Sequence, residues 1–155
     1  FSKAFGVVGG YVSGSEDLRR VAFNKSRTWL LSASHPPPVT AACIAALEVV
    51  ETEPMHLQNL WRNTAYFKKQ LKGMGFDIGN SQTPITPVIV GESPVAQEMS
   101  ALLFEEALFA LPIVFPMVAR DKARIRTMMN AGHTRADLDA ALAAFEKIGR
   151  KLKVL

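Results

Sequence analysis

A lysine near the start of the chain has the surroundings of an amine that reacts with a bulky cofactor. Lys3 lies in the segment FSKAFGVVGG, residues 1–10, between two small residues and ahead of three glycines. If its ε-amine is to condense with the carbonyl group of a planar ring, the neighbouring backbone must approach that ring closely, and small residues permit this. We therefore expect Lys3 to be a catalytic lysine. The alternative is a solvated lysine near a frayed terminus.

The other reactive side chains do not form a recognisable site. The three histidines, His35, His56 and His133, have no cysteine or carboxylate at metal-ligand spacing, so no metal site is expected. We expect His133 to bond locally, because it precedes a helix cap. Cys43 is the only cysteine and lies in an apolar, alanine-rich stretch, which is typical of a buried structural thiol in a reducing compartment.

Composition narrows the class of protein. The chain has 155 residues, 48% of them hydrophobic, which is enough for a core and for one domain, or for one small domain and a piece of another. The net charge of +4 is mild and scattered, and no nucleic-acid-binding motif accompanies it. No apolar run is long enough to span a membrane. We expect no nucleic-acid or membrane partner.

The elements expected in the first half of the chain are those that would position Lys3. Residues 7–13 and residues 29–31 are short apolar runs that predict strands, and Ser15 followed by two acids predicts a helix start. Three prolines make residues 32–38 irregular. Apolar residues at helical spacing then predict two helices with a break near Glu53 and Pro54.

The second half predicts a small sheet covered by helices. Strands are expected at 76–78, 83–90, 108–115 and 123–129, and helices from Ser93-Pro94 and from Thr134 to the end of the chain. From about residue 46 onward the order is helix, strand, strand, helix, strand, strand, helix. This order indicates an α+β arrangement with a mainly antiparallel sheet. In the last strand, Arg124 and Arg126 share one face.

Three segments resemble motifs of the α-oxoamine synthases, enzymes of fold type I that use pyridoxal 5'-phosphate to join an amino acid to an acyl-CoA. The segments are residues 2–11 (SKAFGVVGGY), residues 27–34 (RTWLLSAS) and residues 123–134 (ARIRTMMNAGHT). Two departures are Thr28, where the family usually has proline, and Leu31, where it usually has phenylalanine. The resemblance covers essentially the whole chain, which we expect to be the C-terminal part of a longer enzyme.

The resemblance implies a role for particular residues. Lys3 corresponds to the lysine that forms the Schiff base with pyridoxal phosphate and moves a proton at the substrate Cα. Ser32 and Ala33 correspond to the pair that reaches the cofactor phosphate of the neighbouring subunit, Ala33 through its backbone only. Arg126 corresponds to the arginine that binds the substrate carboxylate, with Arg124 as its rival on the same face.

The resemblance also implies a domain organisation and an activity. Residues 1–45 are expected to end the large cofactor-binding domain and residues 46–155 to form the C-terminal small domain. Residues 83–88 and 144–149 are most similar to the glycine C-acetyltransferases, which condense glycine with acetyl-CoA to 2-amino-3-ketobutyrate. We expect this activity in a cytoplasmic homodimer with a shared active site. Alternatives are an 8-amino-7-oxononanoate synthase or another family member, and a non-catalytic fragment that only folds or associates.

Overall fold

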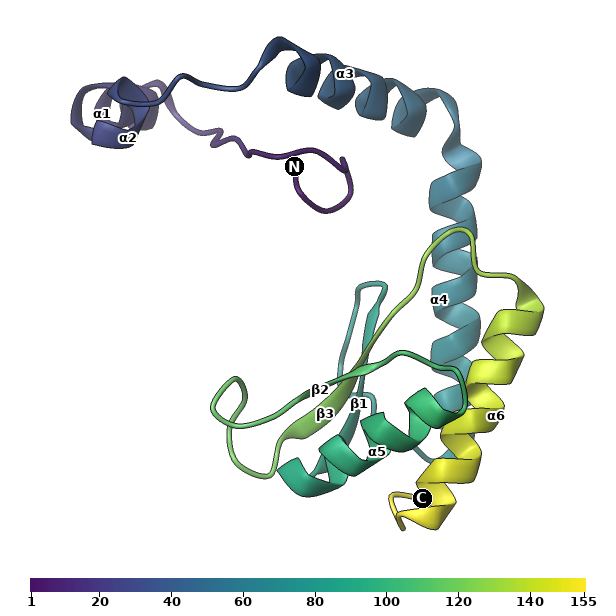
Figure 1. The fold of residues 1–155 in the computed structure, drawn as a ribbon. Coiled ribbons are helices and arrows are strands. Elements are labelled where there is room, and N and C mark those ends of the chain that lie inside the picture. Colours follow the sequence, from purple (N-terminus) through teal and green to yellow (C-terminus); the bar gives the residue numbers. More distant parts are fainter. The chain divides into compact units, whose positions relative to one another are not determined.

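The computed structural model describes residues 1–155 and divides them into two units, Phe1–Pro54 and Met55–Leu155 (Figure 1). The first unit consists of an N-terminal loop followed by helices, and the second contains a sheet and three helices. None of the helices combines the length and the apolar character that crossing a bilayer requires. The two units are described separately below.

The first unit is helical and has no buried residue. It contains α1 (Glu16–Lys25), α2 (Arg27–Leu30) and α3 (Pro37–Thr52). The predicted start of α1 is confirmed, because the Ser15 hydroxyl accepts a hydrogen bond from the Leu18 N–H at 3.3 Å. The predicted break is also confirmed, since α3 ends at Thr52 and the next helix begins at Pro54.

Both strands predicted in the first unit are wrong. Residues 7–13 contain no strand, and residues 29–31 fall at the end of the short helix α2 and just after it. A short apolar run becomes a strand only if a neighbouring strand pairs with its backbone, and no residue of this unit belongs to a sheet. The apolar side chains of both runs are exposed instead, with Val12 at 84% and Leu30 at 81%.

The second unit is built on a three-stranded antiparallel sheet. Its strands are β1 (Ile85–Gly91), β2 (Leu111–Ile113) and β3 (Ala123–Met128), in the order β1-β3-β2. The expected strand at 108–115 is therefore only three residues long. Residues 76–78 are not a strand, although the Asp77 carbonyl accepts a hydrogen bond from the Ile89 N–H at 2.8 Å. The α+β prediction is confirmed with three strands instead of four.

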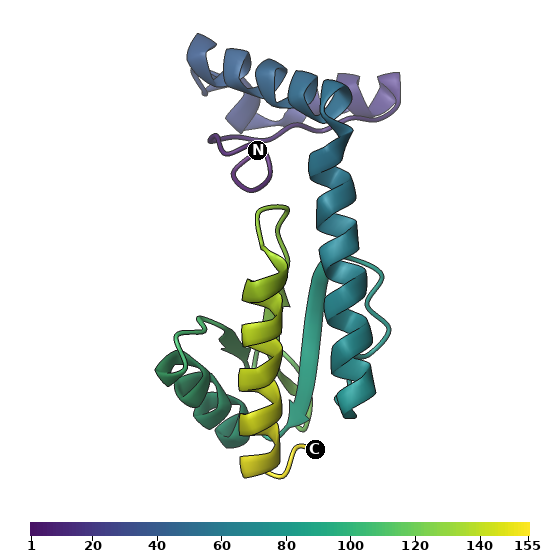
Figure 2. The same ribbon diagram turned by 90° about the vertical axis from the view of Figure 1, so that its right-hand side faces the viewer.

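Three helices pack on one face of this sheet, as Figures 1 and 2 show. They are α4 (Pro54–Met74), α5 (Ser93–Glu105) and α6 (Arg135–Lys151). The predicted cap of α5 is shifted, because Glu92 occupies the N-cap and Ser93 is already helical. The predicted cap of α6 is confirmed as a capping box between Thr134 and Asp137.

One face of the sheet is packed into the core of this unit. Along β3, Ala123, Ile125 and Thr127 are buried, whereas the residues between them face away from the core. The Phe145 ring of α6 packs edge-to-face on the Phe67 ring of α4, with centroids 6.2 Å apart. This alternation leaves both arginines of β3 on the outer face of the sheet.

Candidate functional site

Lys3 lies in a closed loop at the start of the first unit. The Phe1 ammonium donates a hydrogen bond to the Gly9 carbonyl at 2.8 Å, and the Gly6 N–H donates to the Lys3 carbonyl at 3.1 Å. Gly6 has a φ of +66°, a conformation that a residue with a side chain rarely adopts. The Lys3 side chain is exposed and forms neither a hydrogen bond nor an ion pair. The loop therefore presents an unengaged primary amine.

The loop of Lys3 lies against the segment that contains Ser32 and Ala33. The His35 ring stacks edge-on against the Phe1 ring, with centroids 5.8 Å apart. A Cβ built on Gly9, whose φ is +115°, would lie 2.0 Å from the His35 Nε2. The φ of Gly9 favours glycine, and its contact with the His35 ring brings the segment of Lys3 and the segment of Ser32 together within one unit.

Ser32 and Ala33 lie in a turn with the donors that a phosphate requires. The Ser32 hydroxyl accepts a hydrogen bond from the Ser34 N–H at 3.2 Å, and Ser34 has a φ of +64°. The hydroxyl hydrogen of Ser32 remains available to a further acceptor. Ala33 can contribute only its backbone. An exposed amine such as that of Lys3 can condense with an aldehyde, and a hydroxyl with backbone N–H groups, as at Ser32 and Ala33, can bind a phosphate.

Arg126 lies on the outer face of the sheet in the second unit. In the strand register it is opposite Pro87 of β1 and Leu111 of β2, so apolar residues flank it on both sides. Its guanidinium is exposed and forms no hydrogen bond or ion pair. The rival Arg124 differs, because its Nε donates to the Lys122 carbonyl at 3.0 Å. Of the two arginines, only Arg126 has all of its guanidinium donors free for a carboxylate, because the Arg124 Nε is already bonded.

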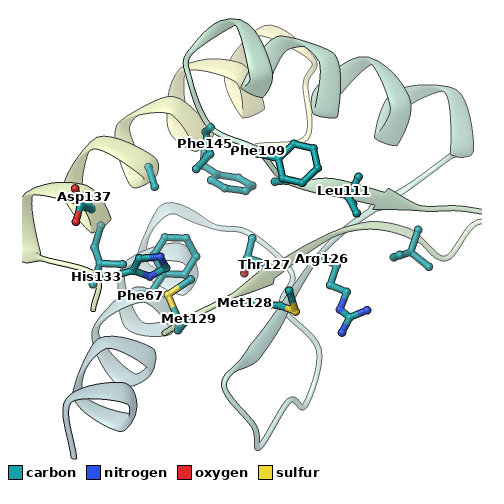
Figure 3. A pocket seen from close by; sticks show the side chains of 15 residues that line it. Phe67, Phe109, Leu111, Arg126, Thr127, Met128, Met129, His133, Asp137 and Phe145 are labelled. Atoms are coloured by element: carbon teal, nitrogen blue, oxygen red, sulfur yellow. The ribbon is translucent and has the colours of Figure 1, made fainter. Parts of the chain in front are cut away.

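A cavity of about 280 Å³ lies beside Arg126 (Figure 3). Pairing between β2 and β3 ends at the Leu111–Arg126 pair, so the next residues of β3 have a neighbouring strand on one side only. The cavity occupies this place, and its walls include Phe67, Phe109 and Phe145. Sequence patterns do not predict it, because it depends on the residue at which β2 ends.

A tightly bonded turn follows β3 and borders the same cavity. The Asn63 side chain of α4 donates to the Asn130 carbonyl at 3.2 Å and to the His133 carbonyl at 2.9 Å. The His133 ring contacts Asn130, which confirms that this histidine bonds locally. Asn63 has no motif around it, and its part in the turn was not predicted.

The capping box next to this turn perturbs one carboxyl group. The Thr134 N–H donates to the Asp137 carboxylate at 2.8 Å, and the Thr134 hydroxyl donates to it at 2.7 Å. These bonds, the backbone one foremost, lower the pKa of Asp137 from its ordinary value. Asp137 thus serves the helix start and is not a free acid or base.

A family model described as aminotransferase class I and II matches residues 1–145. This chain belongs to the aminotransferase class I and II family. It spans about two-fifths of the length of the curated relatives it matches, since 99% of the chain covers 39% of each.

Three curated relatives of this chain all have 8-amino-7-oxononanoate synthase in their names. It is 53% identical over 154 residues to an 8-amino-7-oxononanoate synthase of Symbiobacterium thermophilum. It is 50% identical to a Thermus thermophilus protein named 8-amino-7-oxononanoate synthase/2-amino-3-ketobutyrate coenzyme A ligase. It is 49% identical to 8-amino-7-oxononanoate synthase 1 of Bacillus subtilis.

Solved structures of the same family share the fold. The Sphingomonas wittichii serine palmitoyltransferase has a TM-score of 0.89 and 25% identity, and all of this chain covers 39% of that one. A structure described as SPT with a PLP internal aldimine has a TM-score of 0.90 and 27% identity at the same coverage. The prediction of a pyridoxal phosphate-dependent α-oxoamine synthase segment of fold type I is confirmed. The finer prediction of a glycine C-acetyltransferase is not specifically supported.

Proposed function

We propose that this chain is the C-terminal part of an α-oxoamine synthase that makes 8-amino-7-oxononanoate from an amino acid and an acyl thioester. The relatives' names support this product. The activity first given as an alternative therefore replaces glycine C-acetyltransferase as the main proposal. The observation that carries the proposal is the closed, glycine-containing loop of Lys3, which presents an exposed and unengaged primary amine. In this proposal residues 1–45 end the large domain and residues 46–155 form the small one.

The product name defines the substrates. In 8-amino-7-oxononanoate the ketone is at C7 and the amine at C8, so the new bond joins a seven-carbon acyl group that ends in a carboxylate to a CH3–CH(NH2) group. The second fragment is alanine without its carboxyl group. The reaction therefore consumes alanine and the acyl-CoA, and it releases CoA and CO2.

The predicted site residues have distinct tasks in this reaction. Pyridoxal phosphate, when bound, supplies an electron sink for the negative charge that develops at the amino-acid Cα. The Lys3 amine holds the cofactor before the substrate arrives and later moves a proton at Cα. Ser32 and the Ala33 backbone hold the phosphate across the subunit boundary of a cytoplasmic homodimer. The Arg126 guanidinium orients the amino-acid carboxylate through two parallel hydrogen bonds.

The first experiment tests Lys3 in the full-length parent enzyme. Borohydride reduction should attach the cofactor to the peptide that contains Lys3, and Lys3→Ala should abolish this label and lower turnover by roughly 10²–10⁴-fold. Lys25→Ala is the matched control, because Lys25 is an exposed lysine of α1 in the same unit. A label on another side chain would remove Lys3 from the mechanism.

The second experiment tests Arg126 against Arg124. Arg126→Lys should raise KM for the amino acid by about tenfold or more, because an ammonium cannot reproduce the bidentate geometry. Arg124→Lys should leave this KM nearly unchanged, since the Arg124 Nε already bonds to the Lys122 carbonyl. Equal effects of the two substitutions would exclude Arg126 as the specific carboxylate ligand.

A second candidate function is the condensation of glycine with acetyl-CoA. It is favoured by the Thermus thermophilus relative, whose name includes both activities, and by the TPITPV segment at residues 83–88. This product, 2-amino-3-ketobutyrate, keeps the carboxylate of glycine. Release of labelled CO2 from carboxyl-labelled alanine supports the first function, whereas release of CoA with glycine and acetyl-CoA without labelled CO2 supports the second.

A further inference from the structure

The His35 ring packs against both ends of the loop that contains Lys3. Its centroid lies 5.8 Å from the centroid of the Phe1 ring, with the two ring planes at 62°. At the other end of the loop, a Cβ built on Gly9 would lie 2.0 Å from the His35 Nε2. These contacts are made by the face and edge of the ring, without a hydrogen bond or an ion pair of His35. The ring therefore positions the loop by its shape.

A short and constrained segment joins His35 to Ser32 and Ala33. The Ser34 N–H donates to the Ser32 hydroxyl at 3.2 Å, which closes a turn over these residues. Ser34 has a φ of +64°, a backbone conformation that is uncommon for a residue with a side chain. Pro36 follows His35 directly, and its own ring restricts its φ, which is −58°. The segment therefore has few free rotations that could absorb a displacement of the His35 ring.

We propose that His35 is a positioning residue that couples the two cofactor sites of the homodimer. The inference rests on the proposed function, in which Lys3 holds the cofactor of its own subunit while Ser32 and Ala33 hold the phosphate of the other subunit's cofactor. A cofactor held by Lys3 orders the loop against which the His35 ring packs, and the ring in turn orders the turn that receives the second phosphate. Because coupling between two binding sites is reciprocal, a phosphate at Ser32 also favours the ordered loop of Lys3.

The first unit has the properties that such coupling requires. None of its residues is buried, so the loop and the turn are not held by a core of their own. Ordering them therefore costs conformational entropy. A first cofactor that orders both segments lowers this cost for the second cofactor, which produces positive cooperativity without a change of fold. Coupling between sites typically changes a dissociation constant by about 5- to 150-fold.

The experiment titrates the cofactor-free, full-length parent enzyme with pyridoxal phosphate and measures bound cofactor by equilibrium dialysis. In the unchanged dimer the second dissociation constant, corrected for statistics, should be at least about fivefold lower than the first. His35→Ala removes the ring and should bring the two constants within about twofold of each other. His35→Phe keeps an aromatic ring and should restore most of the difference, since His35 acts through ring contacts.

Two neighbouring glycines test the same contact from its other side. Gly9→Ala places a methyl group against the His35 ring, at a φ of +115°, and should abolish the difference between the two constants as His35→Ala does. Gly10→Ala is the matched control, because a Cβ there would meet nothing within 4 Å, and it should keep the difference. This pair decides the question even if His35→Ala does not fold.

The outcomes separate the two proposals. If the unchanged parent binds no pyridoxal phosphate, or if borohydride attaches it to a residue other than Lys3, the proposed function itself is wrong. If the cofactor binds at Lys3 with two equal constants, or if His35→Ala and Gly9→Ala keep them unequal, His35 does not couple the sites. An equal loss of affinity at both sites with an unchanged ratio would also overturn this inference, because it would indicate a purely structural contact. The same holds if Gly10→Ala abolishes the difference as fully as Gly9→Ala.

Discussion

The two units of this chain differ in how they are stabilised. In Phe1–Pro54 no residue is buried, and many of its large apolar side chains, such as Val12 and Leu30, are exposed. In Met55–Leu155 sixteen hydrophobic residues form one buried cluster, among them Phe67, Leu71 and Phe145. Since burial of apolar surface is the main favourable term in folding, only the second unit contains its own source of stability.

This difference corresponds to a division of the proposed active site. Lys3, Ser32 and Ala33 belong to the unit without a core, whereas Arg126 extends from a strand whose other face is packed into one. The loop of Lys3 depends on local contacts such as that between His35 and Gly9. The Arg126 position is fixed by pairing with strands on both sides. We expect substitutions to affect the two regions very differently.

The largest expected effect is the loss of a buried aromatic ring in the second unit, compared with the loss of an exposed ring in the first. Phe145→Ala empties a buried site and should lower the free energy of unfolding by about 3–5 kcal/mol. Phe23 of α1 is 59% exposed and contacts the Trp29 ring, so Phe23→Ala should cost less than about 1 kcal/mol. Urea denaturation of the 155-residue chain measures both. Similar losses would mean that the first unit has a core of its own.

A pair of glycines sharpens the comparison within the second unit. A Cβ on Gly149 of α6 would lie 2.6 Å from the Phe76 ring, so Gly149→Ala should destabilise the chain by about 1–3 kcal/mol. A Cβ on Gly73 of α4 would meet nothing within 4 Å, so Gly73→Ala should stabilise the chain by about 0.5–1 kcal/mol. Thermal unfolding compares them. If Gly149→Ala stabilised the chain, the Phe76 ring would have to move aside at little cost.

Helices and caps were largely predictable because their signals are local. The Ser15 cap, the break before Pro54 and the capping box at Thr134 each depend on residues within a few positions of one another. Strands were less predictable, since residues 7–13 and 29–31 have suitable composition but no partner strand.

In the candidate site, too, the local features were predictable from the sequence and the non-local ones were not. Alternation along β3 placed Arg126 and Arg124 on one face, but only the structure showed that Arg124 is bonded to a carbonyl. The cavity depends on where β2 stops pairing with β3, which is set by residues about fifteen positions apart in sequence rather than by a motif. The contact of His35 with Gly9 is likewise non-local.

Two paired threonines provide a finer test of the buried sheet face. The Thr86 hydroxyl is buried without a hydrogen-bond partner, so Thr86→Val should stabilise the chain by about 1 kcal/mol. The Thr127 hydroxyl donates to the Thr86 carbonyl, so Thr127→Val should destabilise it by about 1 kcal/mol. The two residues are opposite each other in the register, and their surroundings are therefore matched. Chemical denaturation measures the change in the free energy of unfolding for each variant. Changes of the same sign would contradict this assignment.

The smallest expected effect is the pH dependence of the α6 cap. Hydrogen bonds from Thr134 lower the pKa of Asp137 in the folded chain, so its contribution to stability is complete above the unfolded value of about 4 and is lost as pH falls through the lower folded value. The stability difference between the unchanged chain and Asp137→Asn should therefore shrink below about pH 4. Asp17→Asn is the matched control, because Asp17 lies in the first turn of α1 and its carboxylate accepts no hydrogen bond. Unfolding curves between pH 2 and pH 6 measure both differences. A difference for Asp137→Asn that stays constant across this range would mean that the capping bonds do not depend on the charge of the carboxylate.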